Sequence, residues 1–334
     1  MRDRGFYQTF RRRAPGLIAP GGGLLVAVSG GPDSVCLLHL AVRIGREKGL
    51  AVAAAHVRHH LRRGDSDLDR DFVRSLSRDL GTPFLEREGR LPPGRKRSIE
   101  ELARKLRYRA LGDLAMEWGA RTLWTAHHAD DQAETLLLNL MRGAGPDGLS
   151  GILPERSLDE VRGRAADASL TLARPLLPFG RGEILAYLKS QGLKFRLDRS
   201  NLSLEFRRNW VRKKLLPAMR EVQPAISGIL SATAGIFARE RRFADADFGR
   251  MSARLLGDRA GAGRGESLDL ERFFEYDMGS RLQFLHRLLP KFSGREIERA
   301  YGHLERAWRR RLPVPSLPIS DLIPSRGPGR PALR

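Results

Sequence analysis

The stretch Ser29-Gly30-Gly31-Pro32-Asp33-Ser34 stands between two apolar segments of unlike kind. Before it, residues 24–28 form a short apolar run that predicts a buried strand. After it, residues 35–42 are apolar enough for a packed helix. A glycine-rich turn between a strand and a helix presents free backbone N–H groups at the positive end of the helix dipole. The stretch therefore predicts an anion site, with phosphate as the first candidate.

Each residue type in this loop has a physical use. Gly30 and Gly31 allow the backbone to turn tightly and to approach a ligand closely. Ser29 and Ser34 add hydroxyl donors. Asp33 is placed either to cap the helix or to hold Mg²⁺ beside phosphates. The alternative is an ordinary strand–helix turn in which Asp33 is only a cap.

Two common nucleotide motifs do not fit the loop. It lacks the lysine of G-x-x-x-x-G-K-[ST], which reaches the outer phosphates in a Walker A motif. It also lacks the spacing of G-x-G-x-x-G, so a dinucleotide site is not expected.

The composition points to a polyanionic partner. The 334 residues provide room for two domains, and 41% of them are hydrophobic, which is enough for a sizeable core. The net charge of +21 arises from 60 basic and 39 acidic residues. Nucleic acid is the first candidate for the partner and an anionic membrane the second. The alternative is a compositional bias, because most of the basic residues are arginine.

A lone cysteine, Cys36, excludes an intramolecular disulfide and a cysteine cluster for zinc or iron–sulfur. This cysteine usage fits a reducing cytoplasm. No apolar run approaches the roughly 18 residues of a membrane span, and no secretory leader is expected.

The first half of the chain alternates strand and helix patterns, which predicts an α/β fold with a parallel, Rossmann-like sheet. The expected strands are residues 24–28, 51–57, 82–86 and 121–126. The expected helices are residues 33–48, 65–80, 98–118 and 129–141. Ligands of such sheets bind at the carboxyl ends of strands, which is where the loop at residues 29–34 lies.

The second half is predicted to be mainly helical. A strand at residues 171–176 and helices at residues 181–191 and 206–219 precede a soft boundary near residues 217–224. The helices expected beyond it are residues 224–256, 270–289 and 294–311. We therefore expect three parts: a catalytic domain over residues 1–220, a smaller helical domain over 221–311 and a disordered tail over 312–334.

A second group of polar residues, His127-His128-Ala129-Asp130-Asp131-Gln132-Ala133-Glu134, begins at the end of the fourth expected strand. Asp131 and Glu134 are three residues apart, so their carboxylates share one face of the following helix. Two carboxylates near a phosphate loop could bind Mg²⁺, a cationic substrate or a proton. The alternative is a solvated acidic first turn that complements the helix dipole.

Taken in order, these motifs resemble the tRNA(Ile)-lysidine synthase family of the ATP pyrophosphatase, or PP-loop, superfamily. The similar segments span about residues 22–220 and include residues 26–34, 56–62, 99–108, 127–135, 142–149, 174–176, 198–201 and 206–217. The segment His56-Val57-Arg58-His59-His60-Leu61-Arg62 departs from the usual family pattern, because Arg58 replaces asparagine and His60 replaces glycine. The phosphate loop alone is shared by many families, whereas the ordered set is specific.

The resemblance implies an adenine nucleotide α-hydrolase-like fold and a two-step reaction. ATP would adenylate C2 of the wobble cytidine in the CAU anticodon of tRNA(Ile), with release of pyrophosphate. The ε-amine of L-lysine would then attack, giving lysidine and changing the codon read from AUG to AUA. Mg²⁺ and a cytoplasmic location are implied, and a homodimer is a further expectation.

The resemblance also implies roles for particular residues. ATP would be bound by Ser29, Gly30, Gly31, Pro32, Asp33, Ser34 and His56, with Asp33 holding Mg²⁺. Asp131 and Glu134 would bind lysine. Arg104 and Arg107, one helical turn apart, would clamp phosphate or the developing adenylate; the alternative is a surface pair.

The basic stretch Arg207-Arg208-Asn209, with Arg212 and Lys213 after it, is the expected tRNA contact. Phosphate contacts from such a face would position the tRNA without reading its bases, whereas charge alone would equally fit a solvated helix. The arginines of the last helices, among them Arg239, Arg306 and Arg309, could extend this track.

Two rival interpretations remain open at this point. A tRNA thiolase of the same superfamily is disfavoured where sulfur is carried on cysteine pairs, because Cys36 is the only thiol. A non-catalytic RNA-binding relative could lose Asp33 or the Asp131–Glu134 pair, and both are retained.

Overall fold

The computed structural model describes residues 2–59, 65–89, 99–158, 170–196, 206–257, 267–289, 292, 294–309 and 316–318. Contacts between Cα atoms divide the chain into two compact units, Met1–Ala238 and Arg239–Arg334. This division falls within the long helix of residues 226–255, whereas the division expected from the sequence lies at residue 220, before that helix.

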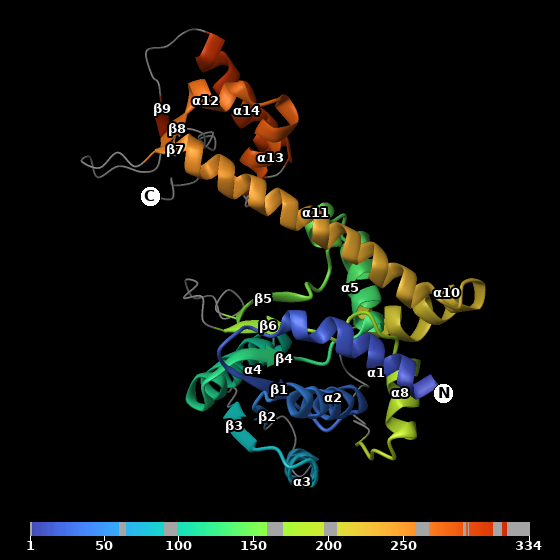
Figure 1. Ribbon diagram of the computed structural model, residues 1–334. Helices are drawn as coiled ribbons and strands as arrows, with labels where there is room; N and C mark the ends of the chain where they lie inside the picture. The colour runs from blue at the N-terminus through green and yellow to red at the C-terminus, as the bar shows by residue number, and fades with distance from the viewer. Residues whose placement is uncertain are drawn as a thin grey trace. The chain divides into compact units, whose positions relative to one another are not determined.

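The first unit is built on a six-stranded sheet with the order β3-β2-β1-β4-β6-β5 (Figure 1). Its strands are β1 Gly23–Ala27, β2 Val52–His59, β3 Phe84–Gly89, β4 Ala120–Trp124, β5 Glu155–Ser157 and β6 Thr171–Ala173. Neighbouring strands are parallel, except that β5 runs antiparallel to β6 at the edge. The predicted parallel α/β fold is therefore confirmed, whereas the antiparallel edge strand was not predicted.

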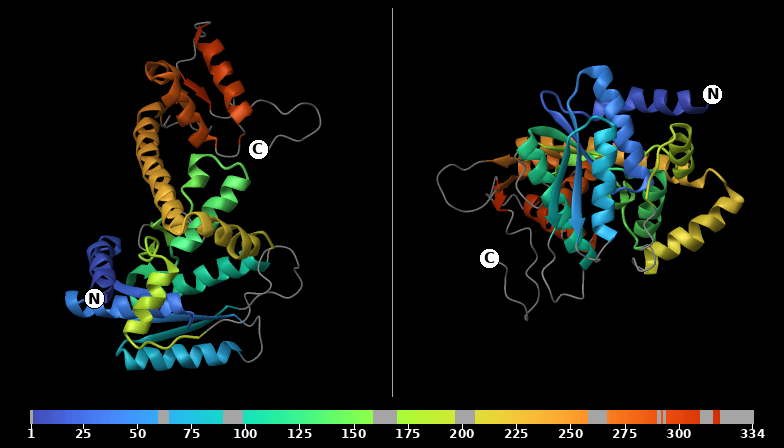
Figure 2. Two further views of the ribbon diagram at one scale, coloured as in Figure 1. Left: turned by 90° about the vertical axis from the view of Figure 1, so that its right-hand side faces the viewer. Right: turned by 90° about the horizontal axis from the view of Figure 1, so that it is seen from below.

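Helices cover both faces of this sheet (Figure 2). The helices of the first unit up to residue 190 are α1 Arg2–Arg13, η1 Ala14–Leu17 (a 3₁₀ turn), α2 Pro32–Lys48, α3 Asp65–Asp79, α4 Ile99–Trp118, α5 Ala129–Met141, α6 Pro146–Leu149 and α8 Arg181–Ser190. Leu24 and Val26 of β1 belong to the core shared with α1, α2, α3 and α8. Leu25 belongs to the core under α4, because successive side chains of a strand point to opposite faces.

One close approach fixes how α2 lies on the sheet. A Cβ atom added at Gly45 would lie 2.8 Å from the carbonyl oxygen of Leu50 and 2.6 Å from the side chain of Val52. Only glycine therefore lets the end of α2 approach the start of β2 this closely. The same helix begins directly after the loop at residues 29–34, so its packing also positions that loop.

The basic stretch expected as one helix over residues 206–219 is interrupted. It consists of α9 Phe206–Trp210, the π-helical turn η2 Val211–Leu215 and α10 Leu216–Val222. In the π turn the Leu216 N–H donates to the carbonyl of Val211, five residues earlier. Pro217 follows and has no N–H, so it cannot continue the α-helical hydrogen-bond pattern.

The second unit combines helices with a small antiparallel sheet of order β7-β8-β9. Its elements after α11 Ile226–Leu255 are β7 Leu256–Gly257, β8 Ser267–Asp269, α12 Leu270–Glu275, α13 Met278–Leu288, α14 Gly294–Arg309 and β9 Ser316–Pro318. The single helix expected over residues 270–289 is wrong, because the Asp277 carboxylate accepts the Ser280 N–H and starts a new helix there. β9 lies within the stretch expected to be disordered, and the rest of that stretch lies outside the described residues.

Among the residues that the structure describes, no helix is both long enough and apolar enough to cross a bilayer.

Candidate active site

The loop at residues 29–34 joins β1 to α2 as the sequence predicts. Gly30 has φ +91°, a left-handed conformation that favours glycine. The Ser34 hydroxyl accepts the Ser29 N–H at 3.1 Å and donates to the Gly31 carbonyl at 3.0 Å. Gly31 is the N-cap of α2, and no side chain caps this helix. The first backbone N–H groups of α2 therefore remain available to an anion.

Asp33 does not serve as the helix cap. Its Oδ1 is buried and has no hydrogen-bond partner among the described residues. Its Oδ2 lies 3.7 Å from Nε2 of His128. Burial raises the pKa of Asp33, and the charges of His128 and Arg181 partly oppose that shift. A partly buried carboxylate with an unused oxygen beside a phosphate loop is suited to a cation.

The N-terminus of α5 brings the second group of polar residues to the same place. His128 is the N-cap: its Nδ1 accepts the Asp130 N–H at 3.2 Å, and its own N–H donates to Asp131 Oδ2 at 3.1 Å. Its Nε2 lies 3.5 Å from Asp131 Oδ2 and thus faces both Asp131 and Asp33. Burial opposes ionisation of Asp131, but His128 and His127 outweigh it, and the pKa of Asp131 is lowered.

Glu134 lies one turn further along α5 and is 1% exposed. Arg212 donates to it twice, from Nε to Oε1 at 2.6 Å and from Nη2 to Oε2 at 3.0 Å. Arg208 donates from Nε to Oε2 at 3.1 Å. Arg212 also lies 3.6 Å from Asp131, and the hydrogen bonds to Glu134 raise its pKa. The π turn and α9 thus close over the carboxylates of α5.

His127 is the neutral member of the site. Burial lowers its pKa to about 4, with Arg174 and Arg104 adding to the shift and Asp131 opposing it. Its Nδ1 lies 3.1 Å from the Thr125 hydroxyl. His127 therefore carries no charge near neutral pH although arginines surround it.

His56 supports the phosphate loop from β2. It is 5% exposed, and its Nδ1 lies 2.8 Å from the carbonyl oxygen of Val28, so the ring donates there. Burial lowers the pKa of His56, which keeps the ring neutral. The contact fixes the end of β1 just before Ser29.

The remaining predicted residues are not all brought to this cluster. Arg104 lies over the ring of Tyr108, with 5.7 Å from its guanidinium carbon to the ring centroid. Its positive charge contributes to the lowered pKa of His127. Arg107 is exposed on the same helix. Lys213 is exposed and Asn209 half-buried, whereas the side chain of Arg207 lies outside the described residues.

Several residues of the site were missed by the sequence analysis. His128 was noted as one of a histidine pair but was given no role, although its ring joins the two carboxylate-bearing helices. Arg220 donates to Asp130 at 2.6 Å, and Arg181 begins α8 near Asp33. Arg174 is 3% exposed and donates to the Leu153 carbonyl at 2.6 Å. The one signal in the sequence that could have identified Arg174 was its place in an Arg-Pro-Leu segment after a strand.

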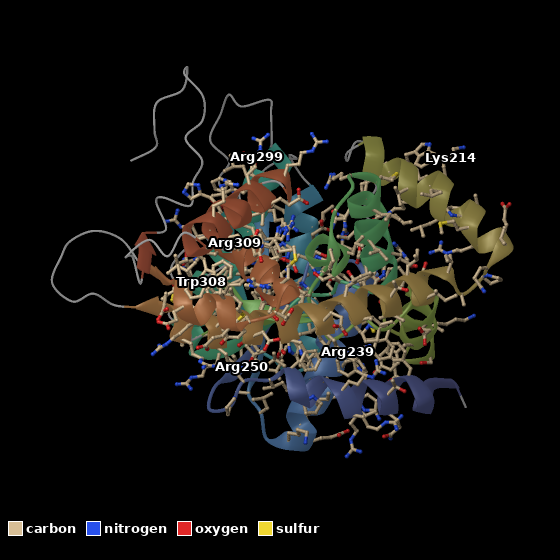
Figure 3. All side chains as sticks on the ribbon, turned by 90° about the horizontal axis from the view of Figure 1, so that it is seen from above. Lys214, Arg239, Arg250, Arg299, Trp308 and Arg309 are labelled. Carbon is tan, nitrogen blue, oxygen red and sulfur yellow. The ribbon has the colours of Figure 1, made fainter. Side chains whose placement is uncertain are left out.

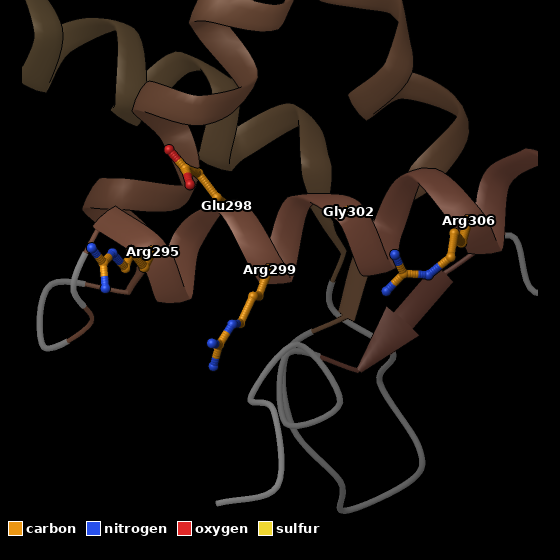
Figure 4. Close-up of a pocket in the computed structure, with 5 residues that line it drawn as sticks. All are labelled: Arg295, Glu298, Arg299, Gly302 and Arg306. Atoms are coloured by element: carbon orange, nitrogen blue, oxygen red, sulfur yellow. The ribbon is translucent and has the colours of Figure 1, made fainter.

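The second unit carries a basic groove of its own, with a volume of about 440 Å³. It runs along the exposed side of α14, which buries Ile297, Tyr301 and Leu304 on the other side. In Figure 4 the side chains of Glu298 and Arg299 point to opposite sides of this helix. The lining residues are Arg295, Glu298, Arg299, Gly302 and Arg306.

Residues 7–219 match the profile of the PP-loop domain family. The α/β sheet with a glycine-rich loop after β1 agrees with this match, and the chain is thus a PP-loop protein. It is 40% identical over 230 residues to tRNA(Ile)-lysidine synthase of Gloeobacter violaceus, which covers 69% of this chain and 67% of that protein. It is 33% identical over 307 residues to the synthase of Dehalococcoides mccartyi, covering 90% and 64%, respectively. The chain belongs to the tRNA(Ile)-lysidine synthase family.

The chain spans only part of several relatives: 64% of the Dehalococcoides protein and 45% of the synthase of Geobacter sulfurreducens, to which it is 41% identical. Among solved structures, the U34-tRNA thiolase NcsA of Methanococcus maripaludis, with its [4Fe-4S] cluster, has a similar fold. The TM-score is 0.56 at 14% identity, over 70% of this chain and 79% of that one.

Proposed function

We propose that the protein ligates L-lysine to C2 of the wobble cytidine in the CAU anticodon of tRNA(Ile). ATP is cleaved to AMP and pyrophosphate, and adenylated tRNA is the intermediate. The observation that carries this proposal is the meeting of the phosphate loop and the α5 carboxylates through His128, whose Nε2 lies 3.7 Å from Asp33 and 3.5 Å from Asp131. One group of residues can therefore serve both the nucleotide and a cationic amine.

The loop is suited to the phosphates of ATP. The uncapped N-terminus of α2 offers backbone N–H groups, and Ser29 offers an exposed hydroxyl. Asp33 would hold Mg²⁺ through its unpaired Oδ1, since Mg²⁺ is usually bound by one or two carboxylates together with substrate phosphates. When bound, the metal neutralises charge on the departing pyrophosphate.

Asp131 and Glu134 would bind lysine. Glu134 is a buried carboxylate that accepts hydrogen bonds from two guanidinium groups, so its oxygens are positioned to accept from a cationic donor. Lysine entry at Glu134 would replace one of these contacts. The face of α5 that carries Asp131 and Glu134 would orient the amine for attack at the adenylated carbon.

Asp131 and the neutral His127 give the site a charge that suits a cationic amine. The lowered pKa of Asp131 keeps its carboxylate ionised, and the lowered pKa of His127 keeps its ring uncharged near neutral pH, so the ring adds no repulsion for the lysine ammonium. In this proposal Arg104, which lies near His127, would stabilise negative charge on the adenylate.

The tRNA would meet both units. Near the active site it would contact the segment of residues 206–215, including Arg207, Arg208, Asn209, Arg212 and Lys213. In the second unit the groove on α14 offers Arg295, Arg299 and Arg306 to the phosphate backbone (Figure 4). We further propose that the protein works in the cytoplasm, where it forms a homodimer.

A thiolase is the nearest alternative, and the cysteine content does not favour it. Cys36 is the only thiol in the sequence; it is buried in α2, and burial raises its pKa. Such a thiol neither holds a cluster nor acts as a sulfur carrier.

The test follows labelled lysine into RNA. Purified protein is incubated with ATP, Mg²⁺, isotopically labelled lysine and an unmodified tRNA(Ile) transcript with a CAU anticodon. We expect incorporation that requires ATP and is lost when the wobble cytidine is changed to uridine. No incorporation, with sulfur transfer in its place when a sulfur donor is supplied, would favour the thiolase.

The Glu134→Gln variant tests the lysine site. We expect its KM for lysine to rise by more than its KM for ATP, because the amide removes the charge that attracts the amine. An unchanged KM for lysine would remove Glu134 from the lysine site. The Asp130→Asn variant is the control, because Asp130 is paired with Arg220 and has no proposed substrate contact.

A further inference from the structure

The segment of residues 206–215 has two faces with different partners. On the inner face, Arg208 and Arg212 are hydrogen-bonded to Glu134. Both are therefore already paired, and their side chains are only 33% and 35% exposed. An RNA molecule that approaches this segment from solvent meets the other face first.

Trp210 lies on that outer face. Positions two apart on a helix point to roughly opposite sides, so Trp210 points away from the side that Arg208 and Arg212 share. Trp210 is 46% exposed. Within the part of the chain that the structure describes, Trp210 has no ring contact and no hydrogen bond. The other largely exposed tryptophan, Trp308, is different, because it is stacked on Phe274 with the rings 5.2 Å apart.

Two lysines stand beside Trp210. Lys213 and Lys214 follow it by three and four residues, within one turn of the π-helical segment. Both are exposed, and neither forms an ion pair with another described residue. Figure 3 shows Lys214 on the outer side of the segment. The outer face thus combines one unstacked aromatic ring with two unpaired cations.

The backbone under this face is held firmly. Val211 is 0% exposed and Leu216 is 1% exposed, and both pack against Ala133, Leu137 and Leu138 of α5. On the same inner side, the ion pairs with Glu134 of α5 fix Arg208 and Arg212. Trp210 therefore projects from a segment that is held against the helix carrying the proposed lysine site.

We propose that Trp210 is a stacking platform for an unpaired base of the tRNA substrate, and that Lys213 and Lys214 bind the phosphates on either side of that base. This proposal rests on the proposed function and deepens it by naming the RNA feature that is recognised. Single-stranded loops are the RNA elements whose bases can stack on aromatic side chains, whereas bases within a duplex are already stacked on each other. The ligand is therefore an RNA loop and not a duplex.

The experiment compares two RNAs on the full chain: an anticodon stem-loop with a CAU loop and a fully paired duplex of equal length. The variants are Trp210→Ala, Trp210→Phe and, as the matched control, Trp308→Phe. We expect Trp210→Ala to weaken stem-loop binding on the order of tenfold and to leave duplex binding unchanged. Trp210→Phe should retain most of the affinity, because phenylalanine keeps an aromatic face.

Two further readouts separate stacking from general charge. In the Trp308→Phe background the stem-loop should quench tryptophan fluorescence, and the additional Trp210→Phe change should remove most of that quenching. Replacing Lys213 and Lys214 with alanine should lower the salt dependence of stem-loop binding by about 0.7 log units per lost phosphate contact.

Several results would overturn the inference. Unchanged stem-loop affinity in Trp210→Ala, or an equal loss for the duplex, would remove the stacking role. A changed oligomeric state in Trp210→Ala, measured by sedimentation, would show that this face is a protein interface. If the chain fails to incorporate lysine but still binds the stem-loop through Trp210, the proposed function fails and this inference stands.

Discussion

Arg212 donates two hydrogen bonds to Glu134 across 78 residues of sequence, at 2.6 and 3.0 Å. The two partners are unequally buried, because the Glu134 side chain is 2% exposed and that of Arg212 is 35% exposed. Arg208 supplies a second cation to the same carboxylate. This pairing connects the helix that carries the proposed lysine site to the segment that carries the proposed tRNA contact.

The unequal burial predicts unequal costs of mutation. Arg212→Ala strands a buried carboxylate with one remaining partner and should lower the free energy of unfolding by about 3 kcal/mol. Glu134→Gln leaves two half-exposed guanidinium groups that water can solvate, and should cost about 1 kcal/mol. Urea denaturation checks both, with Arg250→Ala as a control whose exposed pair with Asp247 contributes under about 1 kcal/mol. A larger cost for Glu134→Gln than for Arg212→Ala would contradict the account.

Asp33 is predicted to serve the nucleotide and not the RNA. Asp33→Ala should abolish adenylation, because it removes the unpaired carboxylate oxygen beside the phosphate loop. Binding of tRNA should stay within about twofold of wild type, since substitutions that leave a partner's contacts untouched usually cost under about 0.5 kcal/mol. AMP release and filter binding measure the two effects. An equal loss of tRNA affinity would assign Asp33 a different role.

Gly30 tests the phosphate loop, and Gly49, at the other end of α2, is its matched control. Both have positive φ, +91° and +64°, so alanine strains the backbone by about 1–2 kcal/mol at either position. A Cβ atom at Gly49 would meet nothing within 4 Å, and one at Gly30 would make ordinary contacts with Phe72 and Val73. We expect both variants to lose similar stability, whereas only Gly30→Ala should lose ATP affinity in a calorimetric titration. Equal ATP affinity in the two variants would place the nucleotide elsewhere.

The half-buried His127, with its lowered pKa, predicts a loss of stability in acid. Its pKa is about 4 in the folded protein and near 6.5 when exposed, so the unfolded chain binds the proton more readily between these values. Stability should therefore be fully present above about pH 6.5 and fall on the order of 2 kcal/mol as the pH drops to about 4. The lowered pKa of His56 acts in the same direction. Urea midpoints across this range should flatten in His127→Asn; an unaltered pH profile would contradict the assignment.

Local patterns were sufficient to predict the strands and helices that carry the phosphate loop and the α5 carboxylates. The loop at 29–34 and the pair Asp131–Glu134 are local in sequence, and each follows a buried strand. Helix α1 was not predicted because its many arginines obscure the helical spacing of the apolar residues Phe6, Tyr7 and Phe10. These three side chains are buried in the core. The small sheet of the second unit was missed because its strands are only two or three residues long.

The pairings within the site could not be predicted, because they join distant segments. Nothing in the sequence near Glu134 indicates that Arg208 and Arg212 lie on its carboxylate. The family resemblance predicted these arginines as tRNA contacts, whereas their charge alone fitted a solvated helix equally well. The π turn decides which side chains face inward, and it depends on Pro217 together with packing on α5. The role of His128 likewise emerges only when α2 and α5 are brought together.

The central claim is tested most directly by the nucleosides of the product RNA. The full chain is incubated with ATP, Mg²⁺, lysine and the tRNA(Ile) transcript, and the RNA is digested and analysed by mass spectrometry. The account predicts that the wobble cytidine is replaced by a lysine adduct of cytidine, and that the Asp33→Ala variant forms none. Unmodified cytidine at that position, from folded protein that still binds ATP and the transcript, would contradict the account.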